Sequence, residues 1–510
     1  MTERSVRRTR RTASKRRAWL AGTPAVWLLS WAVGCGSEGS DDPGTSPETP
    51  TGGVLGASSG GTSPATGGSP GRGGATSLNG GSTNAGKGGA SGGSPALGGG
   101  SSAGAPVAPT GGKSASAGSG GTPTGGVGGA GGTSGGKAGK GGAGGSVPLE
   151  PLDCGPNGIV IENAGPQRNR VNYAILGDGY TEDQVDTFRE HIAVAMAKRF
   201  SSPIGEPYGR YRKFVNICAI PLKSESGPIG SGPTPLSCTG SDSTRLADCD
   251  EAAVRRAFED NLPEDFELDW TAVVLNNEEW WNTGSVLMLW SGANQDADGA
   301  ALHEGGHGFH QLADEYEGTN SGCAREYDEV NSTTDAETTA GKWELWLGYD
   351  QSGATGLQKT VLGSRYCEAD QYRPSDNSMM NLLFGDDGDT SFNAVSREKM
   401  IMDFYRFVTP IDSAEPPAGA VSNPATLTVH VIDPAVIDVD WSVGGEVVMP
   451  QGGPVLDVSA LALPAGTHSI SAEAYDNAGE DLVRYRTGTK WGRMNWARSR
   501  QTVSWTVTVP

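Results

Sequence analysis

Three of the chain's six histidines lie within eight residues, at His303, His307 and His310. The run His-Glu-Gly-Gly-His that begins at His303 places two imidazoles four positions apart, so on a helix both leave the same face one turn apart. Imidazoles at this separation are typical ligands of one zinc ion, and a glutamate beside the first of them can take a proton from a zinc-activated water. The run predicts a hydrolytic Zn2+ site with His303 and His307 as ligands and Glu304 as general base.

A catalytic zinc site needs a third protein ligand, and acidic and histidine side chains downstream of the motif are the candidates. On a continued helix Asp314 would lie about 16 Å beyond His303, because each residue rises about 1.5 Å along the axis. We therefore expect the helix to end near Gly308, in a left-handed C-cap, and the chain to fold back toward the zinc.

The candidates can be ranked by how easily each reaches the ion. Asp314 is the first choice and Glu315 the second. His310 is the third, because it follows His307 so closely that it would need an awkward turn. The carboxylate that does not bind zinc is expected to orient one of the histidines.

The motif needs a helix and a scaffold to hold it. Asp296 or Asp298 can serve as N-cap of that helix. Gly305 and Gly306 lie in its interior, where each costs about 1 kcal/mol relative to alanine. We expect a neighbouring element to pack closely against the face that carries these glycines.

Strand and helix patterns alternate around the motif. A capping box, Thr181-x-x-Gln184, starts a helix that runs to about Phe200. The expected strands are 171–177, 214–222, 270–275 and 285–290, and the other expected helices are 251–261 and a final one reaching Phe407. This alternation predicts an α/β (α+β) domain over 149–412.

Four stretches resemble the bacterial immunoglobulin A peptidase family of zinc metallopeptidases. They are Leu176-Gly177-Asp178-Gly179-Tyr180, Lys223-Ser224-Glu225-Ser226-Gly227, the motif run ending in Leu312-Ala313-Asp314-Glu315-Tyr316, and Tyr372-Arg373-Pro374-Ser375-Asp376-Asn377-Ser378-Met379-Met380. The resemblance covers roughly residues 155–410. It implies a metzincin-like zinc peptidase domain, a sheet packed on the active-site helix, endopeptidase chemistry, and a methionine turn at Ser378-Met379-Met380 beneath the zinc. Where a metzincin has a glycine and its third ligand, this chain has His310 and Ala313, so the third ligand is displaced.

The pattern changes after Pro416-Pro417. Short alternating runs separated by turn residues occupy 426–432, 436–443, 455–460, 468–475, 482–486 and 502–509. They predict a small all-β, immunoglobulin-like sandwich over 413–510. Such a domain could bind substrate, a glycan or another surface protein, or could stabilise its neighbour.

The first 148 residues differ from the rest in composition. Residues 1–35 have a basic start and an apolar run, which is typical of an export signal, and Cys35 ends a sequence that resembles a lipobox. Cys35 is then either acylated or lost to plain signal-peptidase cleavage. Residues 36–148 are rich in Gly, Ser and Thr and should form a disordered tether, since they have little apolar surface to bury.

The cysteine count and the charge agree with export. The six cysteines beyond Cys35 form an even set that can make up to three disulfides, with connectivity left open, although Cys238 and Cys249 could close a surface loop. The net charge of −20 argues against nucleic acid as a partner, because an acidic chain repels phosphates.

These features together predict a secreted or lipid-anchored zinc endopeptidase that acts on protein or peptide substrates. The expected location is extracellular, at the bacterial outer-membrane surface or free, with membrane contact only through Cys35. The alternative is a catalytically silent cell-surface binding or adhesion protein on the same fold. The sequence defines neither the substrate nor the oligomeric state.

Overall fold

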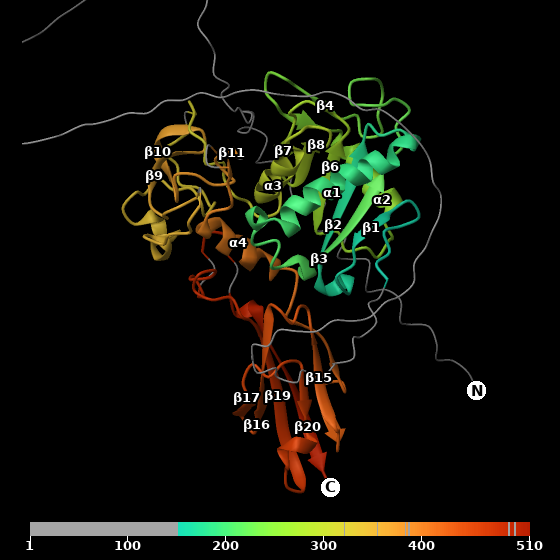
Figure 1. Ribbon diagram of the computed structural model, residues 1–510, viewed down its shortest axis with the longest axis vertical. Coiled ribbons are helices and arrows are strands. Elements are labelled where there is room, and N and C mark those ends of the chain that lie inside the picture. Colours follow the sequence, from blue (N-terminus) through green and yellow to red (C-terminus); the bar gives the residue numbers. More distant parts are fainter. Residues whose placement is uncertain are drawn as a thin grey trace, which may run out of the picture. The chain divides into compact units, whose positions relative to one another are not determined.

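The computed structural model describes residues 151–510, except 321, 354, 383, 386–387, 488–489 and 494–495. The predicted export signal, lipobox and tether therefore lie outside the described residues. The described part is mixed α/β, with several sheets and few helices (Figure 1). This confirms the predicted α/β character.

The elements follow the chain in this order. The α-helices are α1 (Val185–Ser201), α2 (Glu251–Asn261), α3 (Ala297–Gly308) and α4 (Ala394–Phe404). The strands up to α4 are β1 (Ile159–Glu162), β2 (Val171–Asp178), β3 (Val215–Pro221), β4 (Thr239–Gly240), β5 (Ala247–Asp248), β6 (Trp270–Leu275), β7 (Thr283–Gly284), β8 (Leu287–Ser291), β9 (Val361–Ser364), β10 (Cys367–Arg373), β11 (Phe384–Gly385) and β12 (Gly388–Asp389). The later strands are β13 (Ile411–Glu415), β14 (Gly419–Ser422), β15 (Thr426–Val431), β16 (Ile437–Val443), β17 (Glu446–Met449), β18 (Val455–Asp457), β19 (Gly466–Asp476) and β20 (Arg500–Val509). Among the helices of the described residues, none has the length and apolar character needed to cross a membrane.

A six-stranded sheet forms the centre of the region that carries the motif. Its order is β1-β3-β2-β6-β8-β7, with β3, β2, β6 and β8 parallel and the two edge strands antiparallel. Side chains alternate between the faces of a strand. Tyr173 and Ile175 of β2 therefore join the apolar cluster that includes α1 and α3, while Ala174 and Leu176 join the cluster that includes α2. Helices cover both faces, as a largely parallel sheet requires.

The sequence patterns in this region predicted its elements well. Each expected strand and helix between 171 and 290 has a counterpart, with small shifts at the ends, and α2 and β6 have the predicted bounds. The capping box is present, since the Thr181 amide donates to Gln184 Oε1 at 3.1 Å. Both sheet faces and the start of α1 could thus be predicted from local periodicity.

Three disulfides join the six cysteines beyond Cys35, which confirms the predicted number and supplies the connectivity that the sequence left open. They are Cys154–Cys218, Cys238–Cys249 and Cys323–Cys367. The second closes the surface loop expected from the sequence. The third ties the segment after the motif to β10.

The C-terminal part consists of two sheets with a shared core. One sheet has the order β13-β15-β18 and the other β14-β20-β19-β16-β17. Buried Leu427 and Val429 of the first sheet belong to the same apolar cluster as Trp441 and Trp505 of the second. Both sheets therefore turn an apolar face to a common interior.

The strand expected at 482–486 is wrong. This segment is irregular, because its backbone amides find a partner outside any sheet. Those of Arg484 and Tyr485 donate to Glu398 Oε1 of α4 at 2.6 and 2.7 Å. A buried backbone needs hydrogen-bond partners, and here a carboxylate takes the place of a neighbouring strand.

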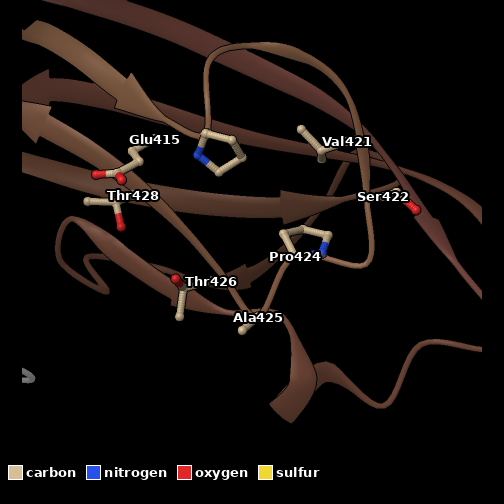
Figure 2. Close-up of a pocket in the computed structure, with 8 residues that line it drawn as sticks. Glu415, Val421, Ser422, Pro424, Ala425, Thr426 and Thr428 are labelled. Atoms are coloured by element: carbon tan, nitrogen blue, oxygen red, sulfur yellow. The ribbon is translucent and has the colours of Figure 1, made fainter.

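A hollow lies on the C-terminal sheets, and Pro424, Thr426 and Thr428 are among the residues that line it (Figure 2). Glu415 is the single ionisable side chain in its lining. The residues that line the hollow include no cluster of metal ligands.

Candidate metal centre

Helix α3 carries the motif at the centre of the packed region. It contacts α1 and β8, and its residues His303 and Glu304 are buried. Both interior glycines have the close neighbours that the sequence predicted. A Cβ at Gly305 would lie 2.9 Å from Arg199 Nη2, and one at Gly306 would lie 2.5 Å from Met380 Sδ.

Helix α3 ends at Gly308, as expected, but without a left-handed C-cap at that residue. Gly308 belongs to the helix, its C-cap Phe309 has φ −97°, and the left-handed residue is Gln311 with φ 54°. A glycine is required at position 308 for a steric reason instead, since a Cβ there would lie 2.6 Å from the Ser285 carbonyl oxygen. The chain still folds back after the helix, as the third-ligand argument required.

Three ligand atoms converge where the chain folds back. His303 Nε2 lies 3.1 Å from His307 Nε2, and Asp314 Oδ1 lies 3.2 and 3.0 Å from these two nitrogens. Ligand atoms of a tetrahedral zinc, bound at 2.0–2.1 Å, are about 3.3 Å apart. The three atoms thus form a triangle that fits one face of a zinc coordination sphere. Asp314, the first-ranked candidate, is the residue that completes it.

Hydrogen bonds fix the orientation of both imidazoles. His303 Nδ1 donates to the Met379 carbonyl at 2.8 Å, and His307 Nδ1 donates to the Leu312 carbonyl at 2.7 Å. The neutral rings therefore direct the lone pair of Nε2 into the triangle. Two lone pairs and a carboxylate oxygen so close together require a cation, which is either a proton or a metal ion.

Without a metal, a proton between His307 and Asp314 serves as that cation. Burial opposes charge on His307, but the adjacent Asp314 carboxylate outweighs it and raises the pKa of His307 to about 9. Burial also works against the charge of Asp314, yet His307 and His303 hold the pKa of its carboxyl well below the usual range. The centre is thus built for a positive species.

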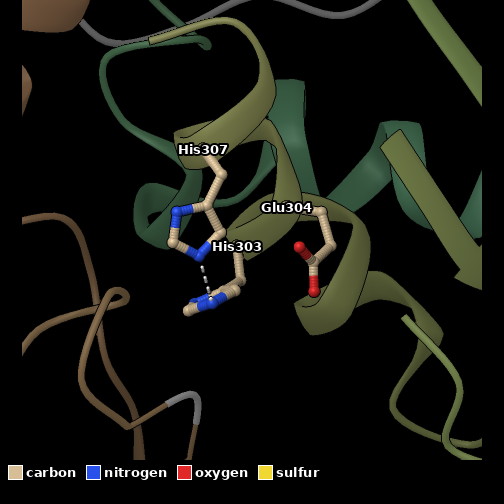
Figure 3. Close-up of side chains that lie close together, drawn as sticks. All are labelled: His303, Glu304 and His307. Carbon is tan, nitrogen blue, oxygen red and sulfur yellow. Dashed lines mark hydrogen bonds between the residues drawn. The ribbon is translucent and has the colours of Figure 1, made fainter. Parts of the chain in front are cut away.

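Glu304 lies beside the triangle on the same helix. Figure 3 shows its carboxylate next to the two imidazoles, and the ligand atoms of Glu304, His303 and His307 all lie within 4.8 Å of one another. These three residues alone would also make a metal group. Asp314 is the better third ligand because its Oδ1 lies at zinc-ligand spacing, 3.2 and 3.0 Å, from the two nitrogens. Burial raises the pKa of Glu304, although the two histidines oppose the shift.

Glu315, the second-ranked ligand, has its carboxylate fully engaged elsewhere. Its Oε1 accepts from Asn331 and Asn393 at 2.8 Å each, and its Oε2 accepts from Ser378 at 2.7 Å. Ser378 precedes Met379, whose carbonyl orients His303. Glu315 therefore holds the segment whose Met379 carbonyl accepts from His303.

His310, the third-ranked ligand, is turned away from the triangle. It is buried, with Nδ1 3.1 Å from Asp403 Oδ2 of α4. Burial lowers its pKa to about 4, against the pull of Asp403. His310 links the end of the motif to α4.

Two tyrosines at the centre were missed by the sequence analysis. The Tyr366 hydroxyl donates to Asp314 Oδ2 at 2.8 Å, and the Tyr316 hydroxyl lies 3.3 Å from His303 Nε2. Tyr316 belongs to the motif run and could have been considered for its closeness to Asp314. Nothing in the sequence indicated Tyr366, because its position depends on the return of a long loop.

The fold and the site define a class of protein: an α/β domain with a His-His-Asp triangle suited to zinc and a buried carboxylate beside it. Residues 159–365 match the family model described as IgA Peptidase M64, which confirms the resemblance that the motifs indicated and makes a peptidase the class of enzyme to expect. No curated protein matches the chain.

Two solved structures share weak likeness with parts of the chain. The fibronectin(III)-like modules of Clostridium thermocellum CbhA are 18% identical over 19% of this chain and 93% of theirs, with a TM-score of 0.12. The endo-beta-1,4-mannanase from Thermotoga petrophila is 14% identical over 27% of this chain and 28% of its own, with a TM-score of 0.13. At these TM-scores neither likeness bears on the fold or the function.

Proposed function

We propose that this chain is a zinc-dependent endopeptidase, in which His303, His307 and Asp314 hold the ion and Glu304 is the general base. The observation that carries the proposal is the triangle of Nε2, Nε2 and Oδ1 atoms at 3.0–3.2 Å, with a buried carboxylate beside it. We further propose that 149–412 is a metzincin-like peptidase domain and 413–510 an immunoglobulin-like sandwich.

The residues around the triangle have distinct tasks. When bound, zinc would polarise the scissile carbonyl and lower the pKa of water. Glu304 would take the proton of the attacking water and pass it to the leaving amine. Its raised pKa suits the second task, because a carboxylic acid with a higher pKa holds its proton until the amine needs it.

We also propose that the protein works outside the cytoplasm, secreted or held at the outer-membrane surface through Cys35. The three disulfides support this location, since such bonds persist in oxidising compartments. Its substrates are proteins or peptides.

Replacing Glu304 by Gln tests the mechanism. The variant should bind zinc like the wild type and lose cleavage of a mixed peptide library, because the amide cannot accept the water's proton. Metal content is measured by mass spectrometry and cleavage by peptide sequencing. Cleavage that persists in Glu304→Gln would rule out Glu304 as the base. A wild type that binds zinc and cleaves no peptide would support a silent binding protein.

A further inference from the structure

The hydroxyl of Tyr316 lies at the edge of the metal triangle. It is 3.3 Å from His303 Nε2, and its ring stacks on the His303 imidazole with centroids 5.8 Å apart and planes at 23°. The side chain is partly exposed, unlike the buried His303. A polar group is therefore held where an incoming substrate would meet the centre.

The backbone holds Tyr316 in a fixed relation to Asp314. Arg365 donates its amide to the Asp314 carbonyl at 2.9 Å, and Tyr366 donates its amide to the Tyr316 carbonyl at 2.9 Å. The Cys323–Cys367 disulfide closes the same pair of segments. These bonds hold residues 314–316 against residues 365–367 of the same chain, so the Tyr316 hydroxyl is preorganised.

The two tyrosines at the centre have different partners. Tyr366 donates its hydroxyl to Asp314 Oδ2, whereas the other oxygen, Oδ1, belongs to the triangle. Tyr316 reaches the triangle itself. Their rings lie 5.7 Å apart, so each can be changed while the other still packs. Tyr366 supports the ligand Asp314, and Tyr316 lies beside the ligand atom of His303.

We propose that Tyr316 is a catalytic residue that donates a hydrogen bond to the scissile carbonyl oxygen; this rests on the proposed peptidase function. As water attacks, the new C–O bond forms and the carbonyl π pair moves to the oxygen. Glu304 then gives the proton that it took from the water to the amine. The C–N bond breaks, its electron pair leaves with the nitrogen, and the pair on the oxygen re-forms the carbonyl. The Tyr316 proton stays on its oxygen throughout and stabilises the negative charge that develops on the carbonyl oxygen in the transition state.

The test compares three tyrosine-to-phenylalanine variants of the full zinc-loaded chain. Tyr316→Phe should lower kcat by about 100-fold, as loss of one oxyanion donor does, with KM within a few-fold. Its zinc content should equal that of the wild type. Affinity for a phosphinic peptide, whose charged oxygen mimics the attacked carbonyl, should fall by a similar factor.

Two matched variants separate this role from simpler ones. Tyr366→Phe should weaken zinc binding by about 10- to 100-fold, as expected for a group that orients a ligand, and recover kcat at saturating zinc. Tyr475→Phe, on the C-terminal strand β19, should match the wild type in every measurement.

The following outcomes would overturn the inference that Tyr316 is a catalytic hydrogen-bond donor. Unchanged kcat and phosphinic-peptide affinity in Tyr316→Phe would mean that the ring only packs on His303. Loss of zinc from Tyr316→Phe would make Tyr316 a support for the ligands rather than a catalytic donor. A wild type that cleaves no peptide would defeat the proposed function, and this inference with it. An active wild type with an equally active Tyr316→Phe defeats the inference alone.

Discussion

At the scale of residues, each of the three proposed ligands is held by a second contact. His303 and His307 donate to backbone carbonyls, and Asp314 accepts from Tyr366. Contacts of this kind fix ring orientation and ligand basicity before the ion arrives. The centre therefore needs little rearrangement to bind zinc.

Replacing Asp314 by Asn should weaken zinc binding by more than about 100-fold. Losing a residue that only hydrogen-bonds a ligand costs about 10- to 100-fold in metal affinity, and losing a charged ligand should cost more. Competition with a chromophoric chelator measures the affinity. Glu317→Gln changes an exposed carboxylate three residues further on and should leave the affinity unchanged. Retained affinity in Asp314→Asn, with loss in Glu315→Gln, would reverse the ranking of these two residues.

Zinc binding should release a proton at pH 7. Next to Asp314, His307 has a pKa of about 9 in the metal-free site, so it carries a proton at pH 7 that must leave before Nε2 can bind zinc. Asp314, with its pKa held low, is already ionised. Affinity should therefore rise about tenfold per pH unit up to about pH 9.

Calorimetry in buffers of different ionisation enthalpy counts the protons released. About one per zinc is expected at pH 7, falling toward zero above pH 9. Binding without proton release at pH 7 would show that His307 does not enter the coordination sphere.

At the scale of elements, what the sequence could predict was local. The strands and α1 follow from apolar periodicity and a capping box, and the convergence of His303 with His307 follows from helix geometry. Asp314 could be favoured because the chain has to fold back within a few residues. Each of these inferences uses contacts between near neighbours in the chain.

The missed features depend on residues far apart in the sequence. Gly308 suggested a left-handed cap, but its lack of a side chain accommodates Ser285 of the β7–β8 turn. The alternation at 482–486 resembled a strand, yet it serves to pack against α4 and Glu398. Tyr366 reaches Asp314 across 52 residues of sequence. Periodicity carries no information on such pairings.

Gly284 of edge strand β7 offers a test of how tightly the elements fit around the base. A Cβ there would lie 2.4 Å from Glu304 Oε2 and 2.7 Å from His307 Cβ. Gly284→Ala should therefore displace Glu304 and lower kcat by about 100-fold, a typical cost of misplacing a catalytic group by about 1 Å. Zinc binding should weaken as well, since the same Cβ would lie 2.9 Å from His307 Cδ2, the ring atom bonded to the ligand atom Nε2.

Steady-state kinetics and metal analysis check this prediction. Gly322→Ala is the matched control, because a Cβ at that position meets its nearest neighbour, the Tyr327 hydroxyl, at an ordinary 3.5 Å. Full activity in Gly284→Ala would show that the general base does not depend on the position in which β7 holds Glu304.

At the scale of the whole molecule, buried carboxylates join the C-terminal sheets to the region of the motif. Glu398 of α4 accepts from the backbone of Arg484 and Tyr485, and pairs with Arg493 at 3.2 Å. Asp476 of β19 accepts from the hydroxyls of Tyr211 and Tyr405 at 2.7 and 2.6 Å. These contacts make the C-terminal part a support for α4.

Helix α4 also contacts residues of the motif run beside the metal centre. Asn393, its N-cap, donates to Glu315, and Asp403 near its end lies against His310. Residues from both ends of α4 thus reach side chains of the motif run, while Glu398 in its middle faces the C-terminal segment.

Glu398→Ala should lower the free energy of unfolding by about 3–5 kcal/mol, because it leaves the buried Arg493 guanidinium without its carboxylate. Chemical denaturation followed by tryptophan fluorescence measures the change. Glu415→Ala removes an exposed carboxylate and should stay within about 0.5 kcal/mol of the wild type. An equally small change in Glu398→Ala would show that the two parts do not depend on this contact.

The most direct test of the proposed zinc centre is anomalous X-ray diffraction at the zinc edge from crystals of the zinc-loaded protein. We predict one peak about 2.0–2.2 Å from His303 Nε2, His307 Nε2 and Asp314 Oδ1, with Glu304 outside bonding distance. A peak bonded to Glu304 in place of Asp314, or no peak at the triangle, would contradict the proposed zinc centre.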